Sequence, residues 1–117
     1  MLLLQRDPAA LQGLLKLGGS ELVRQMIHLF LVHAPERVRT ASEAVRAGDW
    51  TAVERAGHSM KSSAAYLGLT GLQERAARLE ELAAQGGSGE IAGLLREVSE
   101  ALPGLCGLLQ ELAPSRG

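Results

Sequence analysis

The chain has 117 residues, 46% of them hydrophobic and 21% charged, a size and balance that suit one soluble domain with a single core. Leu and Ala supply 22 and 17 residues while Val, Ile and Thr together supply 11, so helix-forming residues dominate and an all-β fold is excluded. A net charge of -1, with one Phe, one Trp and one Tyr, lacks the basic excess and stacking aromatics of nucleic-acid-binding proteins, so we expect no nucleic-acid partner.

Membrane, metal and most enzyme classes are also disfavoured. No apolar run reaches the ~18 residues of a membrane span, and the first residues lack the basic region and cleavage site of a signal peptide, so we expect a cytoplasmic protein without a membrane segment. Cys106 is the single cysteine and is interpreted as a packing residue. His28 and His33 are five positions apart and do not share a helix face, so no metal site is expected. Phosphate-binding loops, dinucleotide fingerprints and serine-nucleophile motifs do not occur in the sequence.

The first predicted helix is short. Asp7 is a typical N-cap, and Pro8 suits the first helical position. The apolar pattern then stops at the Gly18-Gly19 pair, which predicts the end of the helix.

A long helix is predicted next. Ser20 is its expected N-cap, and its apolar residues recur every three or four positions as far as Gly48. Pro35 lies inside this pattern and predicts either a kink or a break into two collinear pieces near Ala34.

The third predicted helix extends from Trp50 to about Leu67. Asp49 is placed to be its N-cap, and Gly68 is the expected left-handed closing residue. Trp50 is expected to be a packing anchor at the helix entrance. The periodicity predicts a buried stripe consisting of Val53, Ala56, Gly57, Met60, Ala64 and Leu67.

Two more helices follow. Thr70 and Gln73 have capping-box spacing and predict the start of the fourth helix, which the Gly86-Gly87 pair ends. Ser88 is expected to start the fifth helix. Its leucine-rich pattern continues without slipping through Pro103-Gly104, so a bent but continuous helix is predicted there.

These elements predict an all-α fold, an antiparallel four-helix bundle with a short extra N-terminal helix. The connections are short, which favours antiparallel neighbours, and each long helix has one apolar stripe. We expect residues 1–117 to form a single domain, with residues 114–117 as a tail that frays. The heptad spacing of the fifth helix leaves room for a dimer, but we expect a monomer.

The third helix carries the candidate site. His58 lies about 160° around the helix from the core stripe and is expected to face solvent, beside the small residues Ser62 and Ala65. Lys61 lies on the same flank, and Glu54, four residues earlier, is placed to orient the ring. Neutral imidazole has one nucleophilic nitrogen while the other donates to a carboxylate, which suits phosphoryl transfer. From the helix alone, an ordinary surface histidine is the alternative.

Residues 56–68 read Ala-Gly-His-Ser-Met-Lys-Ser-Ser-Ala-Ala-Tyr-Leu-Gly and resemble the signature of histidine-containing phosphotransfer (HPt) domains, in which Lys follows the phospho-accepting histidine at the third position. Fainter similarity extends to both sides, and the family fold is an antiparallel four-helix bundle. The resemblance implies that His58 is the phosphorylation site and that Lys61 stabilises the phosphoryl group. It also implies that Ser63 and Gly68 occupy structural positions.

Two positions depart from the family pattern. The family prefers Gly four residues after the histidine, where this chain has Ser62, and Ala before the histidine, where it has Gly57. Ser62 and Ala65 are the expected docking surface for a receiver domain. Because serine is still small, we expect an altered fit to the partner and retained function.

The function that the resemblance implies is that of a histidine phosphocarrier in a multistep His-Asp phosphorelay of a two-component system. The chain would take a phosphoryl group from a receiver-domain aspartyl phosphate and pass it to another receiver. The expected partners are a response-regulator receiver domain, a hybrid histidine kinase, or both. We expect no cofactor on this chain, since Mg²⁺ belongs to the receiver, and no enzymatic activity of its own. The alternatives are a helical adaptor that docks receivers without being phosphorylated, and a segment of a larger histidine kinase.

Overall fold

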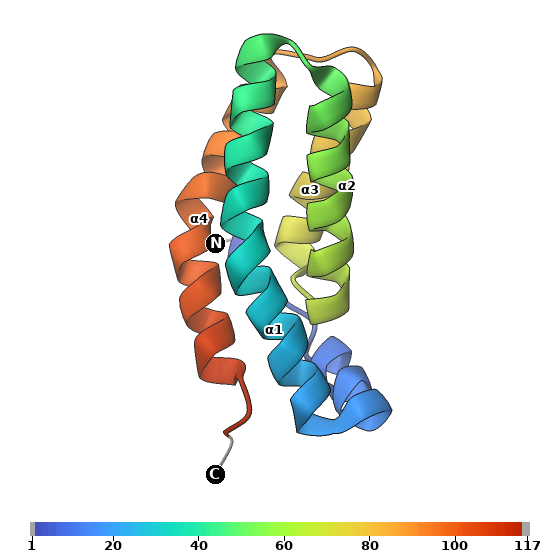
Figure 1. The fold of residues 1–117 in the computed structure, drawn as a ribbon, viewed down its shortest axis with the longest axis vertical. Helices are drawn as coiled ribbons and strands as arrows, with labels where there is room; N and C mark the ends of the chain where they lie inside the picture. Colours follow the sequence, from blue (N-terminus) through green and yellow to red (C-terminus); the bar gives the residue numbers. More distant parts are fainter. Residues whose placement is uncertain (1, 116–117) are drawn as a thin grey trace.

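The computed structural model describes residues 2–115, and every regular element in that range is a helix (Figure 1). The elements are the 3-10 helix η1 (Leu2–Leu4) and the α-helices α1 (Pro8–Ala47), α2 (Trp50–Leu67), α3 (Thr70–Ala84) and α4 (Glu90–Leu112). Around the bundle α1 packs on α2, α2 on α3, α3 on α4 and α4 on α1, with consecutive helices antiparallel. The predicted antiparallel four-helix bundle is confirmed. Of the expected tail, residues 116–117 lie outside the described residues.

The predicted short N-terminal helix is the first segment of α1. Gly19 has φ 72° and ψ -169°, so the chain turns sharply there and residues 8–18 leave the axis of the rest of α1 (Figure 1). The backbone is helical on both sides of Pro35, so a break near Ala34 does not occur. The Asp7 carboxylate accepts a hydrogen bond from the Ala9 N–H, which makes it the N-cap as predicted.

The ends of α2 agree with the sequence. Asp49 Oδ1 accepts a hydrogen bond from the Ala52 N–H at 3.2 Å, and Gly68 closes the helix in the left-handed region with φ 70°. Trp50 is half-buried and packs against the core as the predicted anchor. All six predicted stripe residues of α2 are buried.

The start of α3 differs from the prediction. The N-cap is Leu69, which makes no side-chain cap, and Thr70 is already helical. Only two residues connect α2 to α3, and the completely buried Leu69 side chain fixes the chain in the core. The core contact of Leu69 therefore decides the start of α3, and the Thr70 capping box does not form.

Ser88 precedes α4, and its hydroxyl accepts a hydrogen bond from the Glu90 N–H. As predicted, α4 continues through Pro103.

The N-terminal segment covers the end of the bundle where α2 meets α3. The Asp7 N–H donates a hydrogen bond of 2.7 Å to the Gly68 carbonyl, and the Gly71 N–H lies 3.5 Å from the Gln5 carbonyl. A Cβ on Gly68 would lie 2.4 Å from the Asp7 carbonyl oxygen, so only glycine fits. Gly68 therefore ends α2 and also admits the N-terminal segment.

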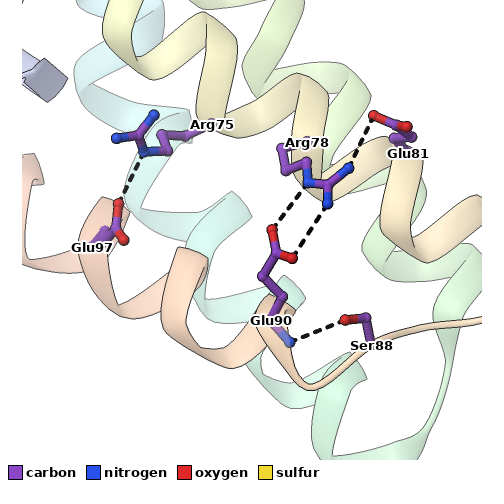
Figure 2. Close-up of polar contacts among 6 residues, drawn as sticks. All are labelled: Arg75, Arg78, Glu81, Ser88, Glu90 and Glu97. Carbon is purple, nitrogen blue, oxygen red and sulfur yellow. Dashed lines mark hydrogen bonds and ion pairs between the residues drawn. The ribbon is translucent and has the colours of Figure 1, made fainter.

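Ion pairs cross the contact between α3 and α4, the least extensive of the helix pairs around the bundle (Figure 2). Arg78 donates two hydrogen bonds to Glu90, at 3.0 and 3.3 Å, and Arg75 donates one to Glu97 at 2.9 Å. By contrast, α2 and α3 share the most extensive contact in the bundle.

No helix within residues 2–115 is long and apolar enough to cross a membrane.

Candidate functional site

His58 is exposed on α2, on the side of the helix away from the core. Its side chain is 62% exposed, while Gly57 and Met60 beside it are buried. The prediction that His58 faces solvent is therefore confirmed. Its helix is fixed on both sides, because α2 packs against α1 and α3.

A glutamate from the neighbouring helix contacts the His58 ring. Glu80 of α3 places its Oε2 atom 2.8 Å from Nδ1 of His58. The other oxygen of the same carboxylate, Oε1, accepts a hydrogen bond from Nζ of Lys61. One carboxylate therefore joins the histidine and the lysine, and its side chain is itself only 23% exposed.

The charge on Glu80 determines which ring nitrogen is nucleophilic. The hydrogen bond from Lys61 lowers the pKa of the Glu80 carboxyl, desolvation opposes this, and the bond to His58 adds to the lowering. An ionised carboxylate can only accept hydrogen bonds, so the contact requires a proton on Nδ1 of His58. In the neutral ring Nε2 then has the free lone pair.

Glu54 does not orient the ring, contrary to the prediction. Among the described residues Glu54 makes no hydrogen bond or ion pair, whereas Nδ1 of His58 bonds to Glu80. The spacing of four residues within one helix favoured Glu54, but the ring contacts the neighbouring helix α3 instead. Glu80 could have been found from the antiparallel pairing of the two helices, since it follows the buried Leu79 on the edge of the α3 stripe.

A groove of about 400 Å³ lies between α1 and α2 beside His58. Apolar side chains of both helices line most of it, among them Leu29, Phe30, Met60 and Tyr66. Ser62 and Ser63 also line it and are half-buried, while Ala65 is exposed one turn farther along α2. Gly68 lies at the end of the helix and has the structural role described above.

Helix periodicity and motifs do not predict this groove. Its rim includes the exposed side chains of Leu29 and Tyr66, which lie outside the core stripes of their helices. Large apolar residues outside a stripe are the signal that could have indicated it. On the α1 side, Arg37 Nε donates a hydrogen bond of 3.0 Å to the Ser59 hydroxyl. His33 lines the same groove and is exposed.

Metal-binding groups are dispersed. Within residues 2–115, no three His, Cys, Asp or Glu side chains lie close enough together to hold a metal ion. Burial raises the pKa of the Cys106 thiol, which is the opposite of the shift that activates a thiol as a nucleophile. The imidazole of His58 is therefore the candidate nucleophile of this site.

Known proteins resemble this chain in fold and in sequence. No curated protein matches the chain. Among solved structures, the crystal structure of histidine-containing phosphotransfer protein B (HptB) from Pseudomonas aeruginosa PAO1 has the same fold, with a TM-score of 0.84 and 23% sequence identity over 92% of this chain and 93% of that one. The sequence model of the Hpt domain matches residues 25–113, which include all of the site. The chain therefore belongs to the Hpt domain family.

Proposed function

We propose that this Hpt domain carries a phosphoryl group on Nε2 of His58, and that it exchanges this group with the aspartates of receiver domains. The observation that carries the proposal is the contact of Nδ1 with the Glu80 carboxylate, which leaves Nε2 as the free nucleophile on an exposed ring. A histidine phosphotransfer function within a phosphorelay follows from membership of the family.

The transfer needs no group on this chain beyond those already present. The lone pair of Nε2 attacks the phosphorus of an aspartyl phosphate, the N–P bond forms, and the P–O bond to the aspartate breaks. The aspartate leaves as a carboxylate with the electron pair of that bond. The ring becomes positive while its proton stays on Nδ1, where the charge is stabilised by the Glu80 carboxylate. The reverse reaction returns the group to a receiver.

Lys61 is the cation in this proposal. A phosphoryl group on His58 would add about two negative charges, and the ammonium group of Lys61 can offset one of them. Lys61 is 35% exposed, so its Nζ can reach towards solvent as well as towards Glu80. Lys61→Gln should therefore reduce the lifetime or the yield of the phosphorylated form without preventing its formation.

The receiver would dock on the face of α2 that presents His58. Ser62 and Ala65 are small and leave room for a partner close to the ring. The apolar groove between α1 and α2 borders this face and offers a surface for an apolar partner helix. The receiver would bring the acidic pocket and the Mg²⁺ that support transfer, so this chain would act as a phosphocarrier without catalytic activity of its own.

Phosphorylation with a matched control tests the proposal. Wild type, His58→Gln and His33→Gln are incubated with a phosphorylated receiver domain. His33 is a suitable control because it is exposed beside the same groove. We expect an acid-labile, alkali-stable phosphoprotein from wild type and His33→Gln, and none from His58→Gln. Equal labelling of wild type and His58→Gln would refute the proposal.

A receiver-binding adaptor is the second candidate. It is favoured by the exposed Leu29 and Tyr66 side chains, which can hold a partner without any phosphorylation. An adaptor predicts that His58→Ala retains both receiver affinity and signalling. A carrier predicts that the same variant retains affinity and loses signalling.

A further inference from the structure

Gly57 lies where the backbone of α3 is in close contact with α2. A Cβ at this position would lie 2.9 Å from the Glu80 backbone nitrogen, 3.1 Å from the Ala76 carbonyl oxygen and 3.3 Å from the Glu80 Cα. All three neighbours are backbone atoms, which cannot rotate away as a flexible side chain can. Contacts of a Cβ become ordinary only at 3.4 Å, so an alanine would have to separate the two backbones by about 0.5 Å.

The glycine is not needed for its backbone conformation. Gly57 lies in the middle of α2, and the glycines with positive φ are at other positions of the described chain. A glycine inside a helix destabilises it relative to alanine. The close packing of α2 against α3 is therefore the structural advantage that glycine provides at position 57.

The residue that touches Gly57 is the one that holds the site together. The backbone of Glu80 lies against Gly57, and its side chain bonds to two residues that follow Gly57 on α2, at Nδ1 of His58 and Nζ of Lys61. Both bonds depend on the distance between α2 and α3 at this level. A separation of about 0.5 Å, set by the contact with the Glu80 backbone nitrogen, moves the residue that carries the carboxylate and so acts directly on its reach.

We propose that Gly57 is a positioning residue for the phosphoryl chemistry. Because it has no Cβ, α3 packs close enough to α2 for the Glu80 carboxylate to bond to His58 and Lys61 at the same time. The expected effect of Gly57 on the rate of phosphoryl transfer rests on the proposed function. The arrangement of the unphosphorylated ring follows from the close packing alone.

The test reads the His58 ring directly. The ¹⁵N chemical shifts of its two nitrogens show which one carries the proton in the neutral ring. Four proteins are compared: Gly57→Ala, Glu80→Gln, the double variant, and Gly107→Ala as the control. Gly107 is a helical glycine of α4 with open space around it, so this control changes helix propensity without a close contact.

We expect wild type and Gly107→Ala to hold the proton on Nδ1. Gly57→Ala and Glu80→Gln should both shift the ring to a mixture of the two tautomers, and the double variant should resemble Glu80→Gln alone. The rate of phosphorylation in Gly57→Ala should fall about tenfold, because a misplacement of about 1 Å can cost about a hundredfold. A wild-type ring in Gly57→Ala, or effects that add in the double variant, would overturn the inference.

Glu80→Asp gives an independent measurement should Gly57→Ala fail to fold. It shortens the side chain by one methylene and leaves Gly57 unchanged, so it reduces the reach without a clash. Loss of the Nδ1 tautomer in this variant supports the inference, and retention of it refutes it. Absence of phosphorylation in wild type would refute the proposed function, whereas the ring spectra would still decide the role of Gly57.

Discussion

At the scale of single residues, Glu80 is the centre of the site. It links the candidate nucleophile His58 to the cation Lys61, and it comes from a different helix. The same carboxylate fixes the ring tautomer and neutralises the lysine while no phosphoryl group is present. The site is therefore a property of two packed helices, although its motif residues lie on one.

The Glu80 interactions should make stability depend on pH. Lys61 and, to a lesser extent, His58 lower the pKa of Glu80 in the folded chain below its usual value of 4.5. A lowered folded pKa means that the stabilisation is fully present above the unfolded pKa and is lost as the pH falls through the folded pKa. Urea unfolding of wild type and Glu80→Gln should give a difference at neutral pH that shrinks in acid. A difference that is the same at both pH values would contradict this.

Ser62 should control access to His58. It is four residues from the histidine and lines the groove beside it. Ser62→Gly should keep or raise the transfer rate while costing up to about 1 kcal/mol of helix stability. Ser62→Gln should block transfer and leave the domain folded. Melting temperatures and transfer rates of the two variants measure this, and wild-type transfer by Ser62→Gln would mean that the receiver does not approach over this face.

Part of the site follows from the sequence of one helix, and part depends on how two helices pack. The exposure of His58 and the position of Lys61 on the same flank follow from the periodicity of one helix, and the resemblance to the HPt signature implies their roles. The antiparallel pairing of α2 and α3 indicates Glu80 as a candidate, but its contact with the ring depends on how closely α3 approaches α2, which periodicity does not give. Glu54 was preferred only because it is close along the chain. The close approach itself depends on Gly57, whose burial was predicted but whose contact was not.

At the scale of the helices, the first and last residues of a helix can be predicted where a single capping residue determines them. The bounds of α2 were predictable because Asp49 caps one end and Gly68 closes the other. The start of α3 was not, because the buried Leu69 takes precedence over the capping pattern of Thr70. A capping pattern therefore does not predict the start of a helix where a buried residue fixes a short connection in the core.

The two closing glycines allow a matched experiment. Gly48 and Gly68 have nearly equal φ values, 69° and 70°, but only Gly68 lies against another segment. Gly48→Ala should cost about 1 kcal/mol for the left-handed conformation alone. Gly68→Ala should cost roughly 1–3 kcal/mol more, because the added Cβ collides with the Asp7 carbonyl.

Unfolding in urea measures both costs. Hydrogen exchange should also show that the Asp7 amide loses protection in Gly68→Ala, since its partner is the Gly68 carbonyl. Equal costs for the two variants would show that the N-terminal segment does not press on the end of α2.

At the scale of the whole molecule, the bundle has two unequal sides. The contact of α2 with α3 is extensive and contains the site, whereas that of α3 with α4 is small and is crossed by ion pairs (Figure 2). The order of the helices around the bundle was predictable from short connections and single apolar stripes. The ion pairs were not, because they depend on which exposed residues face each other across a groove.

The ion pairs between α3 and α4 should be sensitive to salt. The bonds to Glu90 raise the pKa of Arg78, and those from Arg78 lower the pKa of Glu90, but both groups are exposed and open to screening. Arg78→Gln should lower the urea midpoint slightly in dilute buffer, and the difference should vanish in concentrated salt. Phosphotransfer should be unchanged, because the site lies on the other contact of α3. A difference that persists in concentrated salt would mean that Arg78 acts through packing.

The most direct test of the account is a chase of the phosphoryl group through His58. The labelled phosphoprotein is separated from its donor and mixed with fresh receiver domain and Mg²⁺, and the label on each protein is followed with time. We predict that the label leaves His58 and appears on the aspartate of the receiver, and that Glu80→Gln slows both the loading and the chase. Label that stays on the protein, or a wild-type rate in both steps for Glu80→Gln, would contradict a phosphocarrier whose nucleophile is set by Glu80.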